Sequence, residues 1–256
     1  MINTTNNVRD LVVSATTAVF NDKDASAVDR YFAADYKQHS QLVGDGREAF
    51  RGLAADLPAD FRYEPVRVLA DGDLVVAHGI YHGFGATPLV AFDIFRVAGD
   101  QIVEHWDALT PLIEQTVSGR SQTDGANEVT NPDATADSRK LVTELAEKVL
   151  VGADYSVLTD YISTETYLQH NPGAADGLAG FGAAAAAWAE DGKPLVYDRV
   201  HQVIAEGEFA FVRAEGEFGG PVSYNDLFRV QDGRIVEHWD VIDPIQGEQP
   251  HDNGVF

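Results

Sequence analysis

The sequence predicts an α+β protein made of two tandem domains, each with three helices followed by a long antiparallel sheet. Three observations lead to this prediction. The residues Ile-Val-Glu-His-Trp-Asp occur at 102–107 and again at 235–240, 133 positions apart (235 − 102). Before each copy, the spacing of apolar residues changes from near four to two, as expected where helices give way to strands. Between the copies, residues 114–137 are polar and lack periodicity, which is typical of a linker.

A repeat of this length corresponds to a whole small domain, because solenoid units span only about 20–50 residues. The chain has 256 residues, 45% of them apolar, which is enough to build one core in each half. We expect domains at 1–116 and 137–256, joined by a linker at 117–136.

The first half should begin with helices and continue into strands. Helices are expected at 8–21, 25–33 and 47–57, the last ending before Pro58, with a short strand at 36–39. Four strands should follow at 63–70, 74–84, 88–97 and 101–109.

The second half repeats this pattern. Its helices are expected around 141–149 and at 155–162 and 178–188, with a short strand at 167–170. Its long strands are expected at 196–205, 208–218, 223–230 and 234–241. Asp232-Gly233 predicts a type I′ hairpin turn between the last two strands. The polar tail after Pro244 should be frayed.

The formal net charge of −23 argues against a nucleic-acid partner and against an anionic membrane surface, since both require clustered Lys and Arg. No apolar run approaches the ~18 residues of a membrane span, and no signal segment is recognisable. We expect a soluble, cytoplasmic protein. The absence of cysteine excludes disulfides, thiolate metal sites and cysteine nucleophiles.

Two motifs carry a family resemblance. Each half has Tyr-x-Gln-His early, at 36–39 and 167–170, and Asp-x-Phe-Arg-Val followed by the repeated hexapeptide late. Three helices before an antiparallel meander with these motifs resemble the SnoaL-like polyketide cyclase family, of the nuclear-transport-factor-two-like superfamily. The second half is the closer match, because it continues into Asn171-Pro172-Gly173 where the first half has Ser40-Gln41-Leu42.

The resemblance implies cone-shaped domains, each with a curved sheet around an apolar pocket that the helices cover. It also implies that the two halves pair through their sheets as an intramolecular pseudo-dimer, with further homo-oligomers left open. In the aldol cyclases of the family, an acid/base aspartate and a histidine lie on the last hairpin. By position the aspartate is Asp240 or Asp107, while Asp226 or Asp93 replaces the histidine.

Aldol or isomerase chemistry without a cofactor needs a base that removes a proton next to a carbonyl, and a donor for the resulting oxyanion. An aspartate in an apolar pocket can be that base, because burial raises its pKa. His170, or its counterpart His39, is the expected donor or proton shuttle. The expected catalytic residues are therefore Asp240, Asp226, His170, Asp107, Asp93 and His39. The expected substrate contacts are Trp239, Glu237, Tyr167, Trp106, Glu104 and Tyr36.

The last hairpin leaves alternatives open. With a two-residue turn and regular pairing, Asp226 and Glu237 share one face of the sheet, while His238 and Asp240 share the other. Either pair could line the pocket, unless a β-bulge merges the two sets. Alternatively, these charged residues form only cross-strand ion pairs, and Trp239 is a core residue.

No metal or other cofactor is expected. His78 and His82 share a face of one strand but lie about 13 Å apart, four residues at ~3.3 Å each. The sequence thus favours a cofactor-independent lyase or isomerase acting on a small hydrophobic carbonyl compound, with the second half the active one. A non-catalytic small-molecule-binding protein of the same fold is the alternative.

Overall fold

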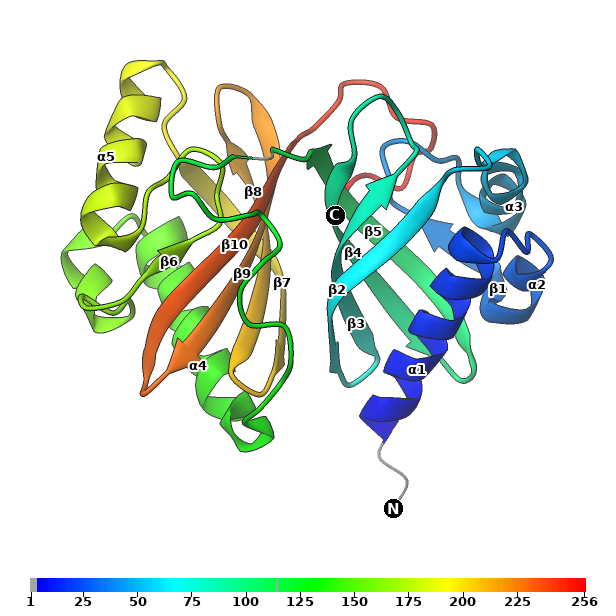
Figure 1. Ribbon diagram of the computed structural model, residues 1–256, viewed down its shortest axis with the longest axis horizontal. Helices are drawn as coiled ribbons and strands as arrows, with labels where there is room; N and C mark the ends of the chain where they lie inside the picture. Colours follow the sequence, from blue (N-terminus) through cyan, green and yellow to red (C-terminus); the bar gives the residue numbers. More distant parts are fainter. Residues whose placement is uncertain (1–3, 114) are drawn as a thin grey trace. The chain divides into compact units, whose positions relative to one another are not determined.

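The computed structural model describes residues 4–113 and 115–256, which form two compact units (Figure 1). Unit 1 contains the chain up to Leu112 together with Gln246–Phe256, and unit 2 is Ile113–Ile245. The expected linker therefore belongs to unit 2, and the C-terminal tail belongs to unit 1. Among the described residues, none of the helices combines the length and the apolar character that a membrane crossing requires.

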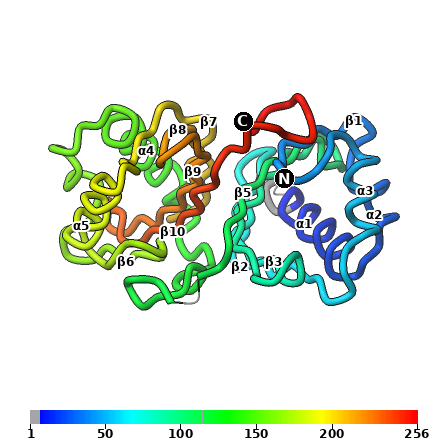
Figure 2. The backbone as a smooth tube through the Cα atoms, turned by 90° about the horizontal axis from the view of Figure 1, so that it is seen from above, coloured from blue at the N-terminus to red at the C-terminus, as the bar shows by residue number. Residues whose placement is uncertain are grey.

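Unit 1 packs its helices against one face of a five-stranded sheet (Figure 2). Its helices are α1 (Thr4–Thr16), which continues as a π-helical turn η1 (Thr17–Asn21), α2 (Ala27–Tyr31) and α3 (Gly46–Asp56). Its strands are β1 (Phe32–Gln38), β2 (Arg62–Asp71), β3 (Leu74–His82), β4 (Leu89–Ala98) and β5 (Gln101–Pro111), in the order β1-β5-β4-β3-β2. Strand β1 runs parallel to β5, so the sheet is mixed rather than wholly antiparallel.

Unit 2 repeats this architecture. Its helices are α4 (Thr135–Leu145), continued by the π-helical turn η3 (Ala146–Val151), and α5 (Gly177–Glu190), with 3₁₀ turns η2 (Pro132–Ala134) and η4 (Tyr155–Asp160). Its strands are β6 (Leu168–Gln169), β7 (Val196–Glu206), β8 (Phe209–Glu217), β9 (Pro221–Gln231) and β10 (Arg234–Pro244), in the order β6-β10-β9-β8-β7. Both units therefore confirm the predicted α+β class.

The turn between β9 and β10 has the predicted geometry. Asp232 and Gly233 both have positive φ, 51° and 71°, and the flanking Gln231 and Arg234 pair with each other. A two-residue type I′ turn requires this left-handed conformation at both positions, which Asp-Gly adopts at little cost.

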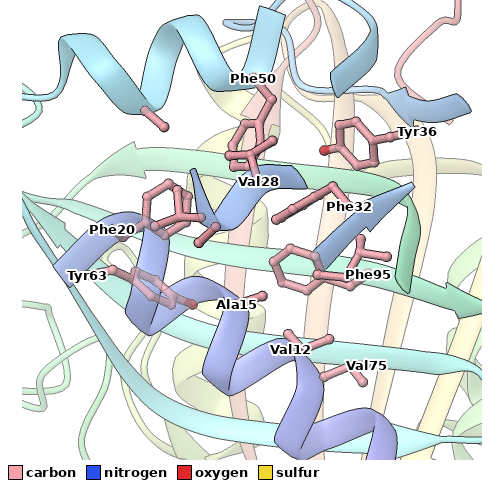
Figure 3. Close-up of a cluster of buried hydrophobic side chains, with 14 of the residues drawn as sticks. Val12, Ala15, Phe20, Val28, Phe32, Tyr36, Phe50, Tyr63, Val75 and Phe95 are labelled. Atoms are coloured by element: carbon pink, nitrogen blue, oxygen red, sulfur yellow. The ribbon is translucent and has the colours of Figure 1, made fainter. Parts of the chain in front are cut away.

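The interior of unit 1 is filled with aromatic side chains (Figure 3). Phe20, at the end of η1, contacts the rings of Phe50, Tyr63 and Tyr81 at centroid distances of 6.0, 6.0 and 5.7 Å. Phe32 packs on Phe50 at 4.7 Å. Rings from the helices and from the sheet of unit 1 thus pack together in its core.

The predicted frayed tail is wrong. Val255 is buried, and the Asn253 side chain donates a hydrogen bond to the carbonyl oxygen of Gln38 at 2.9 Å. The Gly254 carbonyl accepts from Nδ1 of His39 at 2.9 Å. The tail is ordered because unit 1 offers it these partners, which its own polar sequence does not reveal.

Candidate active site

A β-bulge decides which side chains of the last hairpin share a face. Pairing shifts between Ile235 and Glu237, so that Asp240 lies opposite Asp226 and His238 lies opposite Phe228. The extra residue in β10 turns both aspartates and His238 to the same side of the sheet. The third of the predicted alternatives, a bulge that merges the two sets, is therefore the one observed.

These three residues, which we call the site triad (Asp226, His238 and Asp240), lie at the wall of a cavity of about 410 Å³ in unit 2. This volume lies within the usual range for small-molecule pockets. Most of the lining is apolar or aromatic, contributed by α4, η3, η4, α5 and the sheet. Among the larger of these side chains are Leu145, Leu158, Phe181, Trp188, Tyr197 and Phe228.

Two members of the triad form a buried pair. Nε2 of His238 lies 3.0 Å from Oδ1 of Asp226, and Nδ1 lies 3.0 Å from Oε1 of Gln169. Burial opposes the protonated form of His238, but the bond to Asp226 and the charges of both aspartates outweigh it and raise the pKa of this imidazole. With oxygen acceptors at both ring nitrogens, the imidazolium satisfies both bonds. The Tyr197 hydroxyl also donates to Oδ2 of Asp226 at 3.2 Å.

Asp240 is the member of the triad whose carboxyl group has a raised pKa. Burial, with a further contribution from the charge of Asp226, raises the pKa of Asp240 to about 6, although His238 and a hydrogen bond from Asn171 act in the opposite direction. Nδ2 of Asn171 donates that bond to Oδ2 of Asp240 at 2.6 Å. A carboxyl group with such a pKa can both accept and return a proton near neutral pH.

Unit 1 repeats the triad but not the cavity. Asp93, His105 and Asp107, the twin triad, take the same positions after a bulge in β5, and Nε2 of His105 lies 3.3 Å from Oδ1 of Asp93. The space beside them is only about 40 Å³. Phe20 fills it from the helix side, and Tyr81 fills it from β3, where its hydroxyl donates to Oδ1 of Asp93 at 3.0 Å.

Two regions of the chain, residues 13–105 and 142–238, match the family model described as the SnoaL-like domain. The chain belongs to the SnoaL-like domain family. The predicted tandem arrangement of two such domains is thereby confirmed. A comparison with curated proteins found no match.

Several solved structures resemble part of the chain. IdmH, a candidate polyketide cyclase from Streptomyces antibioticus, is 20% identical with a TM-score of 0.36, over 40% of this chain and 91% of that one. A candidate ketosteroid isomerase from Kribbella flavida DSM 17836 is 17% identical with a TM-score of 0.40, over 51% of this chain and 96% of that one. TsrD from Streptomyces laurentii is 20% identical with a TM-score of 0.35, over 41% and 88%.

In the second SnoaL-like domain, His170, Glu237 and Trp239 do not line the cavity. The bulge that turns His238 and Asp240 inward turns Glu237 and Trp239 outward. On that outer face Nε2 of His170 bonds to Oε1 of Glu237 at 3.0 Å, and the His170 ring stacks on Trp239 at 4.7 Å. A ligand in the cavity would therefore not touch the expected proton shuttle or these two expected substrate contacts.

The first SnoaL-like domain places its counterparts in the same way. Nε2 of His39 bonds to Oε1 of Glu104 at 2.8 Å, and its ring stacks on Trp106 at 4.9 Å. Tyr36 and Tyr167 instead belong to the interiors of their domains, and Tyr167 lines the cavity. Of the twelve expected site residues, the structure brings Asp226, Asp240 and Tyr167 together at the cavity.

The residues of the cavity that hydrogen-bond to the two aspartates were not among the expected site residues: His238, Asn171 and Tyr197. Signals for two of them were present. His238 was predicted to share a face with Asp240, and Asn171 belongs to the motif that makes the second SnoaL-like domain the closer family match. Tyr197 had no signal, because its approach to Asp226 depends on how β7 pairs with β8.

The triad also satisfies the distance requirement for metal ligands, since its donor atoms lie within 4.8 Å of one another. However, both ring nitrogens of His238 already face Gln169 and Asp226. A metal would have to replace one of these bonds. The geometry therefore fits shared protons better than metal ligation, and the expectation of no cofactor stays a prediction.

Proposed function

We propose that the second SnoaL-like domain is a cofactor-independent acid/base catalyst, a lyase or isomerase resembling the aldol cyclases, that acts on a small hydrophobic carbonyl compound. The observation that carries this proposal is the position of Asp240, an acid with a pKa raised to about 6, at the wall of an apolar cavity. Its pKa lies close to neutral pH, where a carboxylate base is most effective.

Asp240 is the proposed base. Its carboxylate takes a proton from the carbon next to the substrate carbonyl, leaving an enolate. The enolate either regains the proton at another carbon, which is isomerisation, or attacks a second carbonyl, which forms a carbon–carbon bond and an alkoxide that takes the proton back from Asp240. In both cases Asp240 holds the proton in between.

Tyr167 is the proposed donor to the enolate oxygen. Its ring lines the cavity, and burial together with the charges of Asp226 and Asp240 raises the pKa of its phenol. The phenol therefore keeps its proton and can donate it in a hydrogen bond. His238 lies close to Asp240, and its positive charge limits the rise of the Asp240 pKa.

Proton abstraction can be tested without knowing the natural substrate. We would follow the exchange of α-protons of 2-tetralone, a two-ring ketone, in D₂O by ¹H NMR. Asp240→Asn should lower the enzyme-dependent exchange rate by about 100-fold or more, the usual range for a lost general base. Asp107→Asn changes the matching residue of unit 1 and should leave the rate unchanged. Exchange that survives Asp240→Asn would refute the proposal.

The alternative function is ligand binding without catalysis. The cavity accounts for binding equally well in both cases, because the two functions differ only from proton abstraction onward. In that case 2-tetralone would bind in the cavity, and Trp188→Phe, which changes a lining side chain, would alter its affinity. No exchange above the buffer rate would be seen with this or related ketones.

The pairing of the two halves and the cytoplasmic location stay predictions.

A further inference from the structure

Each unit is completed by a segment that follows the last strand of the other unit's sheet. After β5 of unit 1 the chain enters unit 2, and after β10 of unit 2 it enters unit 1. We call residues 115–125 the first crossing segment and residues 246–256 the second. The first crossing segment bonds to the loop that carries Gln169 and Asn171, which we call the site loop (residues 167–176).

The first crossing segment holds the site loop at three points. The backbone N–H of Val117 donates to the Pro172 carbonyl at 3.0 Å. The Ser118 hydroxyl donates to the Gln169 carbonyl at 2.7 Å. The third point is an ion pair, in which Nη2 of Arg120 lies 2.8 Å from Oδ2 of Asp176.

The held loop contacts the site triad directly. The Gln169 side chain accepts from His238, and the Asn171 side chain donates to Asp240. Asp176 accepts from the Gln169 backbone N–H at 2.9 Å, so the ion pair to Arg120 also fixes the residue that holds His238. Both polar contacts of the site loop with the triad therefore depend on where the crossing segment holds the loop.

Further along, the crossing segment is anchored on the outer face of the sheet. The Ser121 carbonyl accepts from Nδ1 of His170 at 2.7 Å, and the Asp124 carbonyl accepts from Nε1 of Trp239 at 2.9 Å. These residues were expected in the pocket and are instead the anchor of this segment. Alternate residues of the second hexapeptide thus lie on opposite faces of the sheet. His238 and Asp240 point to the cavity, and Glu237 and Trp239 lie on the outer face, where the crossing segment is anchored.

We propose that the first crossing segment is a positioning strap, in which Ser118 and Arg120 hold the site loop so that Asn171 and Gln169 stay bonded to Asp240 and His238. The effect of the strap on catalysis rests on the proposed function, whereas its effect on the position of the site loop does not. The strap gives the duplication a role, because the segment that follows the last strand of unit 1 orients Asp240 at the cavity of unit 2.

The second crossing segment supplies a matched control. Asn253 donates to the Gln38 carbonyl as Ser118 does to Gln169, and the Gly254 carbonyl accepts from His39 as that of Ser121 does from His170. Asn253 also bonds to Asp45, the counterpart of Asp176. In unit 1, however, Ser40 replaces Asn171 and side chains fill the space beside the twin triad. The contacts of the second crossing segment therefore do not orient residues at an open cavity.

The first experiment compares Ser118→Ala/Arg120→Ala with Asn253→Ala in the full chain. We would titrate the Asp240 carboxyl by ¹³C NMR and measure 2-naphthol binding by calorimetry. Since the bond from Asn171 favours the ionised carboxylate, loosening the loop should raise the Asp240 midpoint by roughly one pH unit and weaken binding several-fold. Asn253→Ala should leave both unchanged while lowering thermal stability comparably. An unmoved Asp240 midpoint in the double variant overturns the strap.

A second pair of variants tests the anchored end. Gly125 has a φ of 89°, and a Cβ there would lie 2.2 Å from Oε1 of Glu237 and 3.1 Å from the Trp239 ring. Gly46 of unit 1 lies outside the strap, has a φ of 83° and has nothing near its Cβ position. Gly125→Ala should therefore shift the Asp240 midpoint in the same direction, whereas Gly46→Ala carries similar backbone strain without the clash and should not. Equal effects of the two substitutions would contradict the strap.

The titration separates this inference from the proposed function. It reports the position of the site loop through Asp240 and needs no turnover. If Asp240→Asn leaves α-proton exchange intact, the proposed catalysis fails while the strap can still stand. If Asp240 is essential but its midpoint ignores Ser118 and Arg120, the strap fails while the catalysis stands.

Discussion

Tyr81 and Gly216 occupy corresponding places in the two sheets. Tyr81 helps to fill the space beside the sheet of unit 1, whereas Gly216 leaves the cavity of unit 2 open. Tyr81 pairs with Leu89 at the end of β3, and Gly216 pairs with Val222 at the end of β8. A Cβ at Gly216 would lie 1.9 Å from the Val196 carbonyl oxygen, so β7 approaches too closely for any side chain there. Unit 2 therefore lacks the counterpart of Tyr81, which together with Phe20 fills the corresponding space in unit 1.

The first prediction is that Tyr81→Ala destabilises the protein by about 3–5 kcal/mol, the usual cost of removing a buried aromatic side chain. Tyr81 contacts Phe20 and Phe61 and donates to Asp93, and all of these contacts would be lost. Urea unfolding followed by circular dichroism measures the change. Tyr155→Ala, at a position 51% exposed beside the cavity of unit 2, should cost under about 0.5 kcal/mol. Similar losses would show that the ring does not support the core.

The fold could be predicted where the determinants are local or repeated. The hexapeptide marked the last strand of each half, and Asp232-Gly233 gave the turn because only residues that tolerate positive φ fit there. The second helix of unit 2 was less accurate. Residues 155–160 form a 3₁₀ turn rather than an α-helix.

The site could be predicted only in part, because its geometry depends on long-range pairing. Asp240 and Asp226 were expected from position, but the bulge before Glu237 sets their common face, and Val236 carries no sequence signal for it. The same bulge moves Glu237 and Trp239 away from the cavity. The sequence predicts a linker and a frayed tail at the two crossing segments, since polar sequences show no periodicity even when another part of the chain orders them.

A second prediction concerns the pH dependence of catalysis. If Asp240 is the base, it must be ionised in the free enzyme, so the exchange rate per molar enzyme at low substrate should rise with pH and level off above its pKa of about 6. Asn171→Ala removes the hydrogen bond that favours the carboxylate, so the midpoint should move to higher pH. A pH–rate profile of α-proton exchange tests both. A flat profile between pH 5 and pH 8 would exclude Asp240 as the base.

A third prediction is that Asp240→Asn stabilises the protein at neutral pH. The pKa of Asp240 is about 6 in the folded chain, against about 3.9 for an unfolded aspartate, so the folded state binds more protons between these values. Stability from this group therefore falls as pH rises from about 4 to 6, by on the order of 2–3 kcal/mol. The Asn variant should be more stable than wild type at pH 7.5 and equal near pH 4. Asp35→Asn, at an exposed position, should show no such gain.

The last prediction separates the outer-face anchors of the two units. Glu237 has a side chain 2% exposed and bonds to both His170 and Nε of Arg229, the latter at 2.7 Å. Glu104 makes matching contacts, but its partner Arg96 is 42% exposed, so water can replace a lost bond there. Glu237→Gln removes the charged partner of Arg229, whose side chain is only 18% exposed, and should cost about 3 kcal/mol, whereas Glu104→Gln should cost about 1 kcal/mol or less.

Urea unfolding at several pH values checks this difference and its origin. Burial opposes ionisation of Glu237, but its bonds to His170 and Arg229 outweigh burial and lower its pKa. The folded state therefore binds fewer protons than the unfolded state, and the stability from this group is lost as pH falls through the lowered pKa. The gap between wild type and Glu237→Gln should accordingly shrink in acid. A gap independent of pH would mean that the substitution acts through packing, and equal losses in the two units would mean that burial of the cation does not decide the cost.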